Sequence, residues 1–124
     1  MKKMSETVVF FGSGPVAVKS LIFLKDKFEI EAVITKPATL QEMAQIVPGA
    51  SSKAVKTKEE LTQFISTKPF KSRLGVIVDF GIIVDQTVIN YFPLGIINSH
   101  FSSYFVSHID NFGIFFSFIT GYYF

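Results

Sequence analysis

Asn98 and His100 are the two side chains whose types and spacing best suit catalysis. They stand two residues apart, directly after the apolar run Gly95–Ile97. That run predicts a buried strand, and a spacing of two puts both side chains on the same face of it. At the carboxyl end of a parallel strand, an amide and an imidazole can together stabilise a developing oxyanion. The spacing alone fits a hydrogen-bonded histidine near a strand end at least as well.

The first 35 residues predict the βαβ unit that would support such a strand. We predict a buried strand over residues 7–11, a turn at Gly12-Ser13-Gly14, and a helix from Pro15 to about Lys27. A second strand is expected over residues 28–35, with one side exposed at its start because glutamates alternate there with apolar residues. The inner face of the helix is predicted to consist of Val18, Leu21, Ile22 and Leu24.

The later segments continue the alternation of strands and helices. We predict a short helix within residues 39–47, a loop over 48–52, and a helix from the capping-box sequence at Thr57 to about Thr67. A buried strand over 74–78, a loop over 80–84 and a helix over 86–91 then lead to the strand that carries Asn98. The expected fold class is α/β, with a Rossmann-like, mostly parallel sheet and flanking helices.

Composition and charge exclude only a few classes of function. The chain has 124 residues, 48% of them hydrophobic, which suits one folded domain. All twelve Lys and Arg lie in the first 73 residues together with seven of the ten acidic residues. This imbalance fits a mildly basic face for an anionic ligand such as a phosphate or RNA, and solvated surface lysines explain it equally well. The absence of cysteine excludes a disulfide framework and fits a reducing cytoplasm.

The Gly12-Ser13-Gly14 turn also has part of the pattern of a dinucleotide-binding loop. The third glycine of that pattern is missing, although Glu31 supplies an acidic residue near the end of the second strand. We therefore expect a phosphate or backbone contact at this helix start and no dinucleotide site. No metal site is expected, because His108 and Asp110 have no partners at ligand spacing.

Three stretches taken together resemble the methionyl-tRNA formyltransferase family. Residues 9–21, VFFGSGPVAVKSL, resemble the opening of the family, and residues 76–84, VIVDFGIIV, are similar to its strand and folate-side loop. Residues 92–102, FPLGIINSHFS, resemble its active-site strand and are the most specific of the three. The resemblance covers about residues 7–102. It implies that residues 1–102 are the N-terminal part of a formyltransferase domain, incomplete at the C-terminus.

The resemblance implies a reaction and a set of site residues. The family transfers a formyl group from 10-formyltetrahydrofolate to the amino group of methionyl initiator tRNA, at translation initiation in the cytoplasm. By resemblance, Asn98 and His100 are two of three catalytic residues, and both can stabilise charge on the attacked formyl group. Gly12 and Ser13 are expected near the acceptor substrate. The pterin pocket is expected to be lined by Phe80, Gly81, Ile82, Ile83 and Val84.

The segment after Ser102 departs from the family. Residues 103–124 are rich in aromatic side chains, carry Asp110 as their only formal charge, and lack the Leu-Leu-Pro loop and the later catalytic Asp of the family. The abrupt change leads us to expect an atypical tail from a shifted reading frame. Formyl transfer is expected to be disabled in this chain, because His100 lacks its orienting carboxylate.

Three other interpretations stay open at this point. One is a different folate-dependent N-formyltransferase, acting on an amino-sugar nucleotide or on glycinamide ribonucleotide. A second is a non-catalytic module that binds folate or a nucleotide. A third is a membrane-associated protein with its aromatic tail in the interface, although that tail has no Lys or Arg face. No apolar run reaches the roughly 18 residues of a membrane span.

Overall fold

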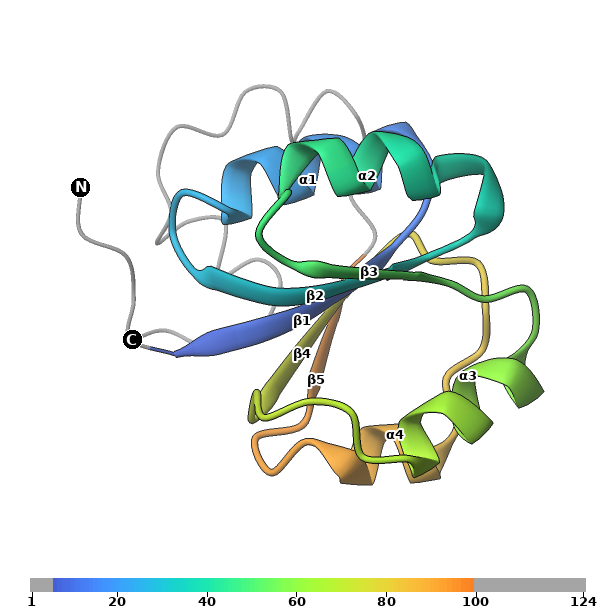
Figure 1. The fold of residues 1–124 in the computed structure, drawn as a ribbon. Coiled ribbons are helices and arrows are strands. Elements are labelled where there is room, and N and C mark those ends of the chain that lie inside the picture. The colour runs from blue at the N-terminus through green and yellow to red at the C-terminus, as the bar shows by residue number, and fades with distance from the viewer. Residues whose placement is uncertain (1–5, 100–124) are drawn as a thin grey trace.

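A single parallel sheet with helices on both faces forms the fold. The computed structural model describes residues 6–99, so His100, the boundary after residue 102 and the segment 103–124 lie outside the described residues. Five parallel strands lie in the order β3-β2-β1-β4-β5 (Figure 1). The strands are β1 (Thr7–Gly12), β2 (Glu29–Thr35), β3 (Ser51–Ala54), β4 (Leu74–Val78) and β5 (Ile96–Ser99).

The helices divide between the two faces of the sheet. One face carries α1 (Pro15–Leu24) and α2 (Leu40–Ile46), and the other carries α3 (Lys58–Ser66) and α4 (Gln86–Tyr91) (Figure 1). A short 3-10 helix, η1 (Pro37–Thr39), precedes α2. The predicted α/β, Rossmann-like fold is therefore confirmed, and the helix over residues 86–91 has the predicted bounds.

Two layers of core pack against the two faces of the sheet. Every residue of β4 is buried, as expected for a parallel strand covered by helices on both sides. Because side chains alternate along a strand, Phe10 of β1 packs with α1 and α2 while Phe11 packs with α3 and α4. Thr57 caps α3 as predicted, since its hydroxyl accepts the N–H of Glu60 at 3.1 Å, while the Glu60 carboxylate accepts the N–H of Lys56 at 3.3 Å.

The prediction of a loop over residues 48–52 is wrong at its end. Residues 51–54 form β3, which pairs in parallel with residues 32–35 of β2. The sequence Ser-Ser-Lys-Ala has little intrinsic preference for a strand, so pairing with β2 decides its conformation. Lys53 is exposed on this edge strand, where a charge discourages pairing with another chain.

The first helix differs from its prediction in length and in one inner residue. It ends at Leu24 rather than near Lys27, because the N–H groups of Lys27 and Phe28 both bond to the carbonyl of Leu24. Leu21 and Leu24 are buried as predicted, whereas Ile22 is 45% exposed. Ile22 lies about 100° around the helix from Leu21, which turns it away from the sheet.

A β-bulge in β2 directs the side chain of Glu31. Val8 pairs with Ile30, but the next residue, Val9, pairs with Ala32, so Glu31 is an extra residue in the ladder. Such an extra residue is free to aim its side chain away from the regular pleat. The glutamates at the start of β2 are more exposed than the apolar residues between and after them, as the alternation predicted.

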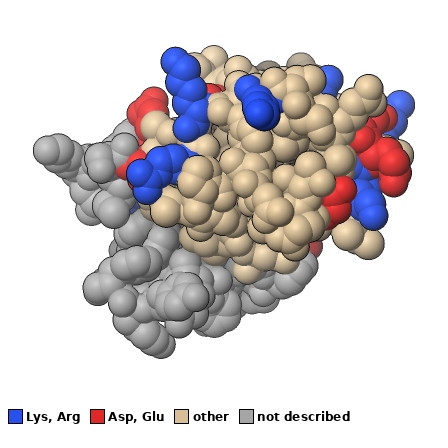
Figure 2. Space-filling view, turned by 90° about the horizontal axis from the view of Figure 1, so that it is seen from below, with Lys and Arg blue, Asp and Glu red and all other residues tan. Residues whose placement is uncertain are grey.

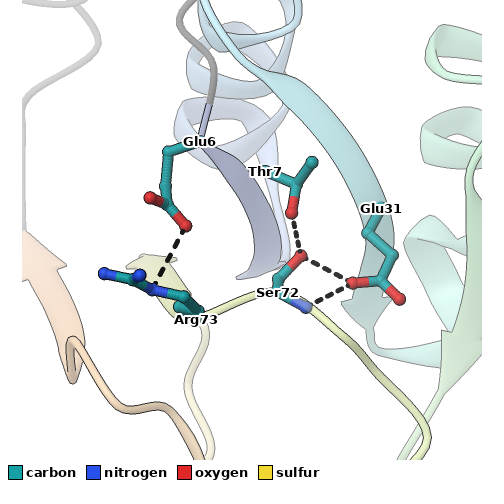
Figure 3. A network of polar contacts seen from close by, with 5 residues as sticks. All are labelled: Glu6, Thr7, Glu31, Ser72 and Arg73. Carbon is teal, nitrogen blue, oxygen red and sulfur yellow. Dashed lines mark hydrogen bonds and ion pairs between the residues drawn. The ribbon is translucent and has the colours of Figure 1, made fainter.

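The carboxylate of Glu31 joins three segments at the amino ends of the strands (Figure 3). It accepts hydrogen bonds from the hydroxyl of Ser72 at 2.6 Å, from the N–H of Ser72 at 2.8 Å and from the N–H of Lys71 at 3.0 Å. The Ser72 hydroxyl also lies 2.9 Å from that of Thr7. Burial raises the pKa of Glu31, but the hydrogen bonds from Ser72 and Lys71 and the charge of Lys71 outweigh it, so the pKa lies below its ordinary value of 4.5.

Replacing Glu31 by Gln should lower the free energy of unfolding by about 1–2 kcal/mol at about pH 7, because Ser72 loses a charged acceptor. Since folding lowers the pKa of Glu31, its contribution is present above the unfolded-state pKa and disappears as the pH falls through the folded-state pKa. The difference between wild type and variant should therefore shrink on acidification. Urea unfolding of both proteins from about pH 7 to about pH 3 measures it.

Glu42→Gln is the matched control, because Glu42 is exposed on α2 and no part of this network. Equal unfolding free energies for wild type and Glu31→Gln near neutral pH would contradict a stabilising role for the network.

Candidate functional site

The carboxyl ends of β1 and β4 meet where the chain reverses its direction across the sheet. From β1 the chain winds to β2 and β3, and it then returns to β4 and β5 on the other side of β1. The loops after β1 and β4 therefore leave toward opposite helix layers (Figure 1). Ligands of open α/β sheets bind at such a point, outside the carboxyl ends of the strands.

Ser13 connects the loops that follow these two strands. Its N–H donates to the carbonyl of Asp79 at 3.4 Å, and its hydroxyl donates to the carbonyl of Phe80 at 3.1 Å. The hydroxyl oxygen can still accept a hydrogen bond from another molecule. Ser13 therefore fixes the start of the loop after β4 and leaves one acceptor position open.

Gly12 allows β4 and α1 to approach the end of β1 closely. A Cβ atom added to Gly12 would lie 2.6 Å from the carbonyl oxygen of Val78 and 2.8 Å from the Cβ of Ala17. Both distances are too short for any side chain, so only glycine fits here. The structure thus gives Gly12, predicted near the acceptor substrate, a packing role at the base of the loops.

Asp85 anchors the far end of the loop after β4. Its carboxylate accepts hydrogen bonds from the hydroxyl of Thr62 on α3 at 2.8 Å and from the N–H of Val88 at 3.2 Å, which caps α4. These bonds lower the pKa of Asp85, so the carboxylate stays charged at neutral pH. With Ser13 holding Phe80 and Asp85 holding α3, the loop over residues 80–84 is fixed at both ends.

A cavity of about 530 Å³ opens between this loop, α4 and β5. Its walls are mostly apolar, and Asn98 is the polar side chain among the lining residues. Ile83 is 76% exposed, which places an apolar surface at the rim. The lining residues are Ile77, Phe80, Gly81, Ile82, Ile83, Val84, Ile89, Ile96 and Asn98. An apolar cavity with a few polar groups in its wall is the usual form of a small-molecule site.

The structure brings most of the predicted site residues together. All five residues of the loop 80–84 line the same cavity as Asn98. Gly12 and Ser13 do not line it and lie at the end of β1, next to the start of the loop. His100 lies outside the described residues, so its pairing with Asn98 stays a prediction.

Three isoleucines that line the cavity, Ile77, Ile89 and Ile96, were not predicted from the sequence. Side chains alternate between the two faces of a strand, so Ile96, two residues before Asn98, lies on the same face as Asn98. Ile96 could therefore have been predicted from the sequence. Ile77 pairs with Asn98 across β4 and β5, and that register follows only from the folded sheet. Ile89 of α4 reaches the cavity through helix packing, which the sequence does not specify.

Other regions of the described chain offer weaker candidates. The prediction that Glu31 stands near the end of the second strand is wrong, because Glu31 is the third residue of β2 and its carboxylate bonds to Ser72 at the amino ends of the strands. A smaller cavity of about 220 Å³ lies at the amino edge beside Lys25 and Asp26. Within residues 6–99 there is no group of three or more His, Cys, Asp or Glu that would hold a metal ion.

The surface that carries α3 and α4 has little concentrated charge. Lys, Arg, Asp and Glu lie mainly toward its margins, with both signs present, and its middle is uncharged (Figure 2). Binding of a nucleic acid depends on clustered positive charge, so this face is a poor RNA surface. None of the helices between residues 6 and 99 has the length and apolar character needed to cross a bilayer.

Comparison with known proteins supports a formyltransferase. No family model matches the chain. The chain is 31% identical over 104 residues to the methionyl-tRNA formyltransferase of Mycoplasma genitalium. The match covers 75% of this chain and 33% of the relative, so the chain spans about a third of the relative's length. The similarity agrees with the transferase class that the three sequence stretches indicate.

Gly12→Ala should destabilise the protein by about 1–3 kcal/mol, because the added methyl group meets the backbone of β4 and cannot be accommodated without moving a strand. Gly49→Ala is the matched control, since a Cβ atom there has no neighbour within 4 Å. We expect that variant to be unchanged or slightly stabilised. Thermal and urea unfolding of the two variants give the comparison, and equal stability of both would show that α1 and β4 do not pack this tightly.

Proposed function

We propose that this chain binds 10-formyltetrahydrofolate and is part of a formyltransferase that formylates methionyl initiator tRNA in the cytoplasm. The observation that supports this most directly is the cavity shared by the loop 80–84 and Asn98. The family resemblance assigns the formyl donor to that loop and the reacting group to Asn98. The Mycoplasma relative is a methionyl-tRNA formyltransferase, which supports methionyl-tRNA as the acceptor.

The cavity suits a pterin ring for physical reasons. A pterin has two flat apolar faces and an edge of alternating hydrogen-bond donors and acceptors. The isoleucines of the cavity offer apolar surface to the faces, and the backbone N–H and C=O groups of the loop 80–84 offer partners to the edge. Because the loop is fixed at both ends, little conformational entropy is lost when the ring binds.

Asn98 is proposed to act on the formyl group of the bound donor. Its side chain lines the cavity and is exposed, so its amide can donate to the formyl oxygen. Negative charge grows on that oxygen when the acceptor amine attacks, and a protonated His100 is proposed to share in its stabilisation. Gly12 and Ser13 are proposed to face the acceptor, where the open acceptor position of Ser13 can take a hydrogen bond from the amine.

Ile83→Asp should weaken binding of 5-formyltetrahydrofolate, a stable analogue of the donor, roughly tenfold or more, because the change removes apolar contact and puts a charge at the cavity rim. Leu94→Asp is the matched control, since Leu94 is 50% exposed and does not line the cavity. Fluorescence or calorimetric titration measures both affinities. No detectable binding to the wild type, or the same loss in both variants, would contradict a folate site in this cavity.

The polypeptide of 124 residues is expected to bind the donor without transferring the formyl group at a useful rate. By the resemblance, Asn98 and His100 are two of the family's three catalytic residues and residues 103–124 contain no match to the third, and loss of one member of such a set lowers rates by several orders of magnitude. A formylation assay with 10-formyltetrahydrofolate and charged initiator tRNA tests this beside the His100→Ala variant. A wild-type rate clearly above that of the variant would show that these residues suffice for catalysis.

A further inference from the structure

Lys36 follows β2 directly and is held in a defined backbone conformation. It is extended, with φ −94° and ψ 159°, as the residue before a proline prefers. The N–H of Thr39 donates to the carbonyl of Lys36 at 3.1 Å, which closes the turn of η1. The backbone of Lys36 is therefore held in place at the carboxyl ends of the strands, and its side chain extends from there.

The ammonium group of Lys36 lies against Gly81 in the loop after β4. A Cβ atom added to Gly81 would lie 2.5 Å from Nζ and 3.3 Å from Cε of Lys36. The lysine thus occupies the space that a side chain at position 81 would need. Since β1 lies between β2 and β4 in the sheet, the stem of Lys36 must span the end of β1 to reach this place.

The charge of Lys36 has no acidic partner among the residues that the structure describes. Two ion pairs of the described part of the chain, Lys25 with Asp26 and Arg73 with Glu6, do not involve Lys36. Lys36 is nevertheless half-buried, so part of its hydration is lost without a compensating carboxylate. An ammonium group held in this way is suited to bind an anion supplied by a ligand.

We propose that Lys36 binds a carboxylate in the glutamate tail of the reduced folate whose pterin occupies the cavity. The inference rests on the proposed function and adds to it a residue that selects the charged tail of the donor. Gly81 links Lys36 to the folate site, because it lines the cavity and also lies against the ammonium group of Lys36. An apolar cavity with a cation beside one of its lining residues, Gly81, fits a ligand with a flat ring and an anionic tail better than a neutral ring alone.

The experiment measures separately how the glutamate tail and the pterin ring of the folate contribute to binding. Wild type, Lys36→Gln and Lys25→Gln are titrated with 5-formyltetrahydrofolate and with 6-methyltetrahydropterin, which has the ring but no tail. Lys36→Gln should weaken folate binding roughly 3- to 10-fold and leave pterin binding unchanged. Lys25→Gln should change neither, because Lys25 pairs with Asp26 at the opposite edge of the sheet. Added salt should weaken folate binding to the wild type more than to Lys36→Gln.

Several outcomes would overturn the proposal. Lys36→Gln binding folate as tightly as the wild type would show that the ammonium group makes no contact with the tail. An equal loss for folate and pterin would show that Lys36 only shapes the cavity, and circular dichroism with thermal unfolding checks that the variant folds. If the wild type binds neither ligand, the proposed function fails together with this inference. If it binds folate and only the Lys36 effect is missing, this inference fails alone.

Discussion

The two hydrogen bonds from Ser13 to the loop after β4 are the constraint on which the candidate site depends. Parallel neighbours such as β1 and β4 send their loops toward opposite helix layers, so nothing in the sheet itself holds those loops together. Ser13 supplies the connection through Asp79 and Phe80, and Gly12 makes it possible by letting the strands and α1 approach closely. The cavity exists because the loop that forms its wall starts from this fixed point and ends at the cap of α4.

Polar side chains make different contacts at the two ends of the parallel strands. At the amino edge, the bulge in β2 turns Glu31 toward Ser72 and ties three chain segments together in a polar network. At the carboxyl edge, polar groups such as Asn98 and Lys36 have no comparable network among the described residues and are available to a ligand. Glu31 thus stabilises the fold at the amino ends of the strands, and Asp85 does so beside the cavity by capping α4, whereas Asn98 and Lys36 are the groups that we propose contact the ligand.

The sequence predicts the parts of this structure that depend on local signals. Proline at the start of α1, the cap at Thr57 and the apolar run of β4 each determine an element through neighbouring residues. β3 could not be predicted, because its residues have no strand preference and take their conformation from pairing with β2. The contact of Lys36 with Gly81 could not be predicted from the sequence either, since it joins residues 45 positions apart across an intervening strand. Asn98 was predicted from its type and its place after an apolar run, the loop 80–84 was predicted from the family resemblance, and the structure adds Ile77, Ile89 and Ile96 around them.

The most direct test of the central claim is to locate a reduced folate on the protein by nuclear magnetic resonance. Titration of the ¹⁵N-labelled chain with 5-formyltetrahydrofolate should shift the backbone amides of residues 80–84 and the side-chain amide of Asn98. Contacts between ligand and protein protons should join the pterin to Ile83 and Ile96. The amides around Lys25 and Gly49, which line the smaller cavity at the amino edge, should stay unchanged. Shifts confined to the smaller cavity, or no shifts in the loop 80–84 at saturating ligand, would contradict a folate site between that loop, α4 and β5.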